Sequence, residues 1–222
     1  MSDGSDSLNL DAVALFALPN VVLLPRAVLP LHIFEFRYQI MTADALQSGK
    51  LVAMALLKPG WEKDYYGRPA IEPVVCVGQI RSWEQLPDGK YNFLLQGIAR
   101  ATIEKEHTDR PYRYASLARL RETKVFEIDL GRERDRLREL FASPPLNQLP
   151  VAGQFLQFLA GPLATADVAD LVAFHFIDQV SLKQSFLADG DVGARVRRIV
   201  AALEANRPFT AMLQKDDSAK WN

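Results

Sequence analysis

Hydrophobic residues in the first half of the chain occur in short runs that are separated by turn residues. Short apolar runs bounded by Pro, Gly, Asn or Asp are typical of β-strands. The runs lie at residues 13–18, 21–24, 29–34, 51–57, 73–83, 91–104 and 112–120. We therefore predict six or more strands within residues 11–122, arranged as a small, mainly antiparallel β-barrel.

Within one stretch of this region, residues 24–41, the spacing of the apolar residues changes from that of a strand to that of a helix. Pro25 and Pro30 bracket a short turn, because each proline fixes its own φ and favours an extended residue before it. The apolar run 29–34 that follows predicts a buried strand. From Arg37 onward the apolar residues recur with helical spacing. The stretch therefore predicts a turn, a strand and the one helix of the barrel region.

The second half of the chain has the periodicity of helices. Apolar residues recur three and four positions apart over residues 123–207, which predicts a bundle of α-helices. Thr165 is placed to cap one of these helices, and Asp191 is placed to cap the last. Ser181 and Gln184 have the spacing of a capping box. The predicted fold class is thus α+β, with a barrel followed by a helical bundle.

Composition narrows the class of protein. Of 222 residues, 49% are hydrophobic, which is enough for a substantial core, and the formal net charge is -1. The single cysteine, Cys76, excludes an internal disulfide and a multi-cysteine zinc site. The apolar runs are too short for a membrane helix and the polar start lacks a secretory signal, so we expect a cytoplasmic protein without a membrane partner. The ends, residues 1–10 and 208–222, are predicted to be flexible.

A hairpin is the clearest local signal in the barrel region. Asp88-Gly89 lies between two β-rich runs, a dipeptide that favours a tight turn between antiparallel strands. Gly78 lies inside the first of these runs, where a glycine indicates a bulge or a close approach of another group.

Several motifs resemble one family. Residues 30–38, which read Pro-Leu-His-Ile-Phe-Glu-Phe-Arg-Tyr, closely resemble the N-terminal signature of the Lon protease substrate-recognition domain, with Leu24-Pro25 before them and Met41 behind. Residues 77–80, 86–92 and 95–100 are similar to further motifs of that family. The signature residues, to which the resemblance assigns structural roles, are Pro25, Pro30, His32, Glu35, Arg37, Tyr38, Gly78, Asp88, Gly89, Gly97 and Arg100. The resemblance implies a barrel like that of PUA domains, a helical bundle after it, and selection of protein substrates.

Catalytic and cofactor motifs are missing from the sequence. The two Gly-Lys pairs, at residues 49–50 and 89–90, are not followed by Ser or Thr, so neither forms a nucleotide-binding P-loop. Cys76 lies in an apolar run and is predicted to be a buried side chain. The three histidines lie far apart in sequence, and His175 is expected to lie in the bundle core. We predict no catalytic residue, no metal site and no cofactor.

Glu35 and Arg37 flank the predicted strand-to-helix junction. A carboxylate at a helix start complements the helix dipole, and a nearby guanidinium can pair with it. An architectural role is one interpretation of these two charges, and ligand binding is the other.

A basic run at Arg132, Arg134, Arg136 and Arg138 raises the question of nucleic acid. Acidic residues alternate with these arginines, which favours a solvated helical face over a one-sided basic patch. Nucleic acid is therefore not the expected partner. An RNA-binding PUA-like module remains the alternative hypothesis, because the fold permits it.

Aromatic residues are the candidate binding residues. Trp61, Tyr65 and Tyr66 lie in the long loop 58–70, and Trp83 approaches the hairpin. Exposed aromatics are enriched where proteins meet partners, although these side chains could equally pack over the barrel mouth. The leading hypothesis is a non-catalytic module that binds unfolded or exposed polypeptide segments. An adaptor role in protein quality control, with a protease or another protein in trans, is a further hypothesis.

Overall fold

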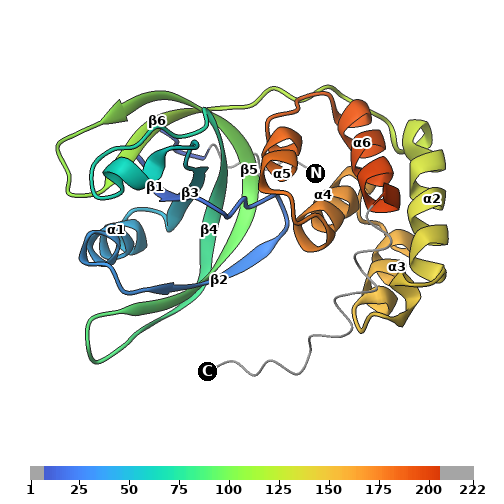
Figure 1. Ribbon diagram of the computed structural model, residues 1–222, viewed down its shortest axis with the longest axis horizontal. Coiled ribbons are helices and arrows are strands. Elements are labelled where there is room, and N and C mark those ends of the chain that lie inside the picture. Colours follow the sequence, from blue (N-terminus) through green and yellow to red (C-terminus); the bar gives the residue numbers. More distant parts are fainter. Residues whose placement is uncertain (1–7, 206–222) are drawn as a thin grey trace, which may run out of the picture. The chain divides into compact units, whose positions relative to one another are not determined.

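A computed structural model describes residues 8–205, which form two compact units (Figure 1). Unit 1 holds the residues up to Leu23 and Val28–Leu120, and unit 2 holds Leu24–Ala27 and the residues from Arg121 onward. Most of the two ends that were predicted to be flexible lies outside the described residues. No helix within the described range is long and apolar enough to span a membrane.

Unit 1 is a closed, mainly antiparallel barrel with one α-helix, as predicted. Its strands are β1 (Val13–Leu18), β2 (Val28–Ile33), β3 (Leu51–Leu56), β4 (Val74–Gln85), β5 (Tyr91–His107) and β6 (Arg113–Arg119), with α1 (Phe36–Gln47) and the short 3-10 helix η1 (Trp61–Asp64) between strands. The sheet order is β2-β5-β4-β3-β1-β6, and β6 also pairs with β5. This second pairing closes β5, β4, β3, β1 and β6 into a ring. β1 and β3 form a parallel pair, and within residues 8–205 the only strand that pairs with β2 is β5.

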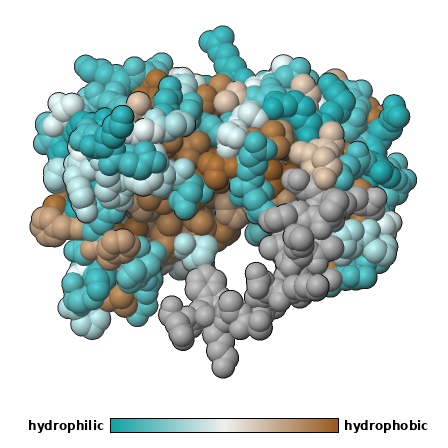
Figure 2. All heavy atoms as spheres, viewed as in Figure 1, coloured by the Kyte–Doolittle hydropathy of each residue, from teal (hydrophilic) through white to brown (hydrophobic). Residues whose placement is uncertain are grey.

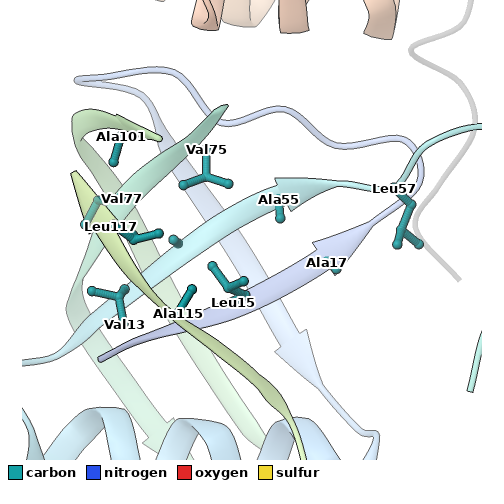
Figure 3. Close-up of a cluster of buried hydrophobic side chains, with 11 residues drawn as sticks. Val13, Leu15, Ala17, Ala55, Leu57, Val75, Val77, Ala101, Ala115 and Leu117 are labelled. Carbon is teal, nitrogen blue, oxygen red and sulfur yellow. The ribbon is translucent and has the colours of Figure 1, made fainter. Parts of the chain in front are cut away.

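The barrel interior is filled mostly by small side chains (Figure 3). Alternate residues of β1, such as Val13, Leu15 and Ala17, point inward, as a strand with a period of two requires. The other members of this core cluster are Ala53, Ala55, Leu57, Val75, Val77, Ala101, Ala115 and Leu117. Alanine and valine at these positions suit a narrow interior.

Helix α1 packs on the barrel through a buried tyrosine. The Tyr38 ring meets the Phe16 ring edge to face, with centroids 4.5 Å apart, and its hydroxyl donates to the Ala17 carbonyl at 3.4 Å. Burial raises the pKa of Tyr38 to about 12. The turn–strand–helix order predicted for residues 24–41 is confirmed.

Two glycines of unit 1 lie where a larger residue would be strained or would clash. The β4–β5 turn lies at Asp88-Gly89, where Gly89 has a φ of 84° and Lys90 pairs with the Asp88 carboxylate at 2.6 Å. At Gly78 the β4–β5 register shifts, and a Cβ added there would lie 2.6 Å from Leu95 Cγ. Gly78, which pairs with Gly97 on β5, therefore combines a bulge with a close approach.

Unit 2 is the predicted helical bundle. It contains α2 (Gly131–Ala142), α3 (Ala152–Ala160), α4 (Thr165–Phe176), α5 (Val180–Leu187) and α6 (Val192–Ala205), with short 3-10 helices η2 (Glu127–Leu130) and η3 (Leu146–Gln148). Its core holds a cluster of aromatic rings: Phe141 stacks on Phe155 at 4.7 Å, and Phe176 meets both edge to face.

The predicted helix caps have mixed outcomes. Asp191 Oδ1 accepts the Ala194 N–H at 2.9 Å, so the predicted cap of α6 is confirmed. Thr165 is not a cap: it is the first helical residue, and its N–H and hydroxyl both donate to the Glu127 carboxylate. The predicted capping box at Ser181 is also wrong, because Ser181 lies inside α5 and that helix has no side-chain cap.

A buried arginine ties the start of unit 2 to its helices. The Arg195 side chain is 2% exposed and lies 2.8 Å from Glu122 and 3.6 Å from Asp170, which is buried as well. Arg195 also donates to the Asp189 carbonyl at 2.7 Å. Pairing compensates in part for the cost of burying these charges.

Candidate functional site

β2 is the edge strand of unit 1, and only one of its faces is buried. Val28, Pro30 and His32 are exposed, whereas the residues between them turn inward and Ile33 is fully covered. The sequence predicted one buried run over 29–34, which is wrong. The missed signal is the proline inside the run, since proline within a sheet is found on edge strands.

The exposed residues of β2, together with Phe34 just after it and Leu94 on β5, form a surface that we call the β2 strip, made of Val28, Pro30, His32, Phe34 and Leu94. Leu94 lies on β5 directly opposite Pro30, and the His32 ring stacks near the Phe34 ring at 6.2 Å. Exposed fractions are 42% for Val28, 40% for Leu94 and 63% for Phe34. Figure 2 shows hydrophobic side chains on the visible face of unit 1, in the area that β2 and α1 occupy in Figure 1. The strip carries no permanently charged side chain.

Two further aromatic side chains of unit 1 are exposed outside the strip. Phe36, at the start of α1, is 75% exposed, and Tyr66 is 87% exposed. Tyr66 was among the predicted binding residues, but Phe34 and Phe36 were missed. Phe34 and Phe36 do not belong to the apolar stripe of the helix that the sequence pattern predicts. The edge position of β2 could not be predicted either, because it depends on which strands pair in the folded sheet.

Glu35 and Arg37, at the strand-to-helix junction, contact each other and Tyr65 of the loop 58–70. Arg37 Nε donates to Glu35 Oε2 at 3.1 Å, and the Tyr65 hydroxyl donates to Glu35 Oε1 at 2.8 Å. The Arg37 guanidinium lies 4.7 Å from the ring centre of Tyr38 and 5.1 Å from that of Tyr65, so it makes cation–π contacts with both. Burial, followed by the hydrogen bond to Glu35, raises the pKa of Tyr65.

The four predicted aromatic residues do not share one surface. Trp61 is half-buried against the barrel core, and Tyr65 is half-buried at the junction. Trp83 is 48% exposed and pairs with Phe93, which places it on the sheet face opposite to Leu94. Of the four, Tyr66 alone is almost fully exposed.

The arginine run of α2 is largely occupied with partners inside unit 2. Arg134 donates to four backbone carbonyls at the end of α3 and just beyond it, so the expectation of a wholly solvated face is wrong for this residue. Arg136 pairs with Glu139 and Glu204, and Arg138 pairs with Asp135. These contacts leave little free positive charge on the run for a phosphate backbone.

The other sequence candidates have structural surroundings. Cys76 is fully buried, and His107 lies 3.0 Å from the Ser116 hydroxyl. His175, expected in the bundle core, is instead exposed on α4 next to Phe174. Across residues 8–205 no group of three or more His, Cys, Asp or Glu side chains is placed to hold a metal ion.

Comparison with known proteins identifies the family. The family model of the ATP-dependent protease La (LON) substrate-binding domain matches residues 12–205. The chain belongs to this family. Lon protease of Desulfosudis oleivorans is 22% identical over 197 residues, which are 87% of this chain and 24% of the relative. Lon protease 2 of Sorangium cellulosum is 25% identical over 220 residues, 93% of this chain and 27% of the relative. The chain thus spans about a quarter of the length of these relatives.

Solved structures of Lon N-terminal domains have the same fold. A Lon N-terminal domain protein from Xanthomonas campestris gives a TM-score of 0.61 at 19% identity, covering 86% of this chain and 97% of that structure. The N-terminal domain of Lon protease from the Mycobacterium avium complex gives 0.68 at 14% identity, covering 87% and 98%. These likenesses confirm the predicted fold class.

Proposed function

We propose that this protein is a recognition module that binds exposed apolar segments of other polypeptides on the β2 strip and the neighbouring Phe36. The observation that carries the proposal is the group of exposed apolar side chains Val28, Pro30, Phe34 and Leu94 on and beside β2, in a chain that belongs to a substrate-binding family. Contiguous apolar surface is typical of interaction sites, whereas single exposed apolar residues need no explanation.

The chemistry of the strip suits unfolded protein. An apolar surface without permanent charge recognises hydrophobic side chains of many sequences and discriminates little between them. Burial of each Å² of apolar surface contributes roughly 25 cal/mol before the costs of association are subtracted, so a strip of this kind supports weak, reversible binding. We propose that the module works by binding and not by catalysis, and that it presents bound segments to a protease or another protein.

The test uses a permanently unfolded probe, a protein whose cysteines have been reduced and alkylated. Binding is measured by calorimetry for the native sequence and for Phe34→Ser and Phe36→Ser. We expect each variant to bind at least several-fold more weakly. Ile128→Ser is the matched control, because Ile128 is 87% exposed but lies in unit 2, so its removal should leave affinity unchanged.

Two results would reject the proposal. One is undetectable binding of the unfolded probe by the folded native protein. The other is equal loss of affinity in the control and in the strip variants. Retention of RNA that falls steeply with salt, measured in parallel, would support the RNA-binding alternative instead.

A further inference from the structure

The outer edge of β2 displays backbone hydrogen-bonding groups in a regular row. Pro30 has no N–H, so its pair with Leu94 must be a non-hydrogen-bonded pair of the antiparallel ladder. Leu29 and Leu31 therefore exchange hydrogen bonds with β5. It follows that Val28, Pro30 and His32 direct their backbone groups away from β5, toward the open edge.

These outward groups are available. The backbone N–H and C=O groups of Val28 and His32, and the Pro30 C=O, have no hydrogen-bond partner within residues 8–205. Figure 1 shows β2 as the border strand of unit 1, with β5 on its inner side. An unpaired strand edge is a template for a further strand.

We propose that a client polypeptide binds as an extended strand, antiparallel to β2, along this edge. The inference rests on the proposed function and adds the conformation of the bound segment. Val28 and His32 would each exchange two hydrogen bonds with the client, and Pro30 would accept one. Residues opposite these three also direct their side chains onto the β2 strip, so one register satisfies both the backbone groups and the apolar surface.

Pro30 determines which occupant fits this edge. Two β2 strands paired with each other would each bring a proline without a donor, so a second copy of the chain would lose hydrogen bonds on both sides. A client segment without proline loses only the one hydrogen bond that Pro30 cannot donate. The edge therefore favours a foreign extended segment with apolar residues at every second position over self-pairing.

The experiment uses a fluorescently labelled peptide in which four valines alternate with threonines, with a lysine at each end. In the proposed complex the valines face the strip and their N–H groups face β2. N-methylation of the valine nitrogens should abolish binding measured by anisotropy. N-methylation of the threonine nitrogens, which face solvent, should leave the Kd within about twofold.

A protein variant tests the same geometry from the other side. Pro30→Val restores an outward N–H and should tighten binding of the parent peptide by about fivefold, the effect of one net hydrogen bond. Pro87→Val is the control, because Pro87 is an exposed proline in the β4–β5 turn. Circular dichroism establishes that both variants fold.

The outcomes separate this inference from the proposed function. If the unfolded protein probe binds but both N-methylated peptides bind equally well, or Pro30→Val does not tighten binding, strand addition is wrong while recognition by the strip stands. If the native protein binds neither peptide nor unfolded protein, the proposed function itself fails. If native chains dimerise through β2 and exclude the peptide, the choice of occupant is overturned.

Discussion

The Tyr65 hydroxyl donates a hydrogen bond of 2.8 Å to Glu35, joining the loop 58–70 to the start of α1. Glu35 also accepts from Arg37, so one carboxylate holds two side chains. Since Tyr65 and Glu35 are 30 positions apart in sequence, their contact is one of the points that hold the loop 58–70 on unit 1.

Tyr65→Phe should loosen the middle of this loop. We expect faster amide hydrogen exchange within residues 58–70 and a loss of about 1 kcal/mol in the free energy of unfolding, because one charge-assisted hydrogen bond is removed. Combined with Glu35→Gln in a double-mutant cycle, the two changes should be less than additive. Tyr66→Phe is the control and should change neither quantity, because Tyr66 is 87% exposed. Additive losses would mean that the contact does not stabilise the loop.

Gly78→Ala should destabilise unit 1. The added methyl group would lie 2.6 Å from Leu95 Cγ inside a packed barrel, and overpacking of this kind costs about 1–3 kcal/mol. Gly131→Ala is the matched control: nothing lies within 4 Å of its added Cβ, and the residue is helical. That variant should be neutral or more stable by up to roughly 1 kcal/mol. Urea denaturation compares the two, and equal stabilities would contradict the close approach.

Stability should fall at high pH because of Tyr38. Its pKa is about 12 in the folded protein, against the ordinary tyrosine value of 10.0 that applies to the unfolded chain, so the folded state holds the proton more tightly. The protonated Tyr38 therefore contributes fully to the free energy of unfolding below pH 10, and this contribution is lost as the pH rises toward 12. The loss amounts to about 2 kcal/mol. Tyr38→Phe should flatten this part of the stability profile. Tyr112, whose pKa is also about 12, leaves a residual slope in that variant.

Arg195→Ala should destabilise unit 2 strongly. Removing the guanidinium leaves Asp170 buried without this partner, and breaking a buried ion pair from one side costs roughly 3–5 kcal/mol. Arg197→Ala, two positions along the same helix at an exposed site, should stay within about 0.5 kcal/mol of the native protein. Thermal denaturation distinguishes them, and a similar melting temperature for both would contradict the role of Arg195.

Local patterns were sufficient to predict most of the fold. The Asp88-Gly89 turn, the strand–helix change after Glu35 and the Asp191 cap depend on neighbouring residues, so the sequence carries them directly. The strand spacing predicted the barrel, and the family signature added its likeness to PUA domains. The Ser181 capping box failed although it is local, because α5 begins one residue before Ser181. The Thr165 cap failed because Thr165 donates instead to Glu127, which lies 38 positions before it.

The candidate site was predicted less well for the same reason. An apolar run does not reveal whether one or both faces of its strand will be covered. The exposure of Val28 and Phe34 depends on which elements pack against them in the fold. The aromatic residues of the loop 58–70 led to the prediction of a binding site there, but Trp61 and Tyr65 pack against the barrel core instead. The proline within β2 was the usable clue.

The assignment of Leu24–Ala27 to unit 2 has a practical consequence for dissecting the molecule. These four residues interrupt unit 1 in sequence, and Arg26 pairs with Asp167 of α4 at 3.1 Å. A truncation after Leu120 would separate Leu24, which is fully buried, from the rest of unit 2. The other fragment, from Arg121 onward, would lack Leu24–Ala27. Neither fragment would be whole, so expression boundaries chosen from a linear map would yield two defective pieces.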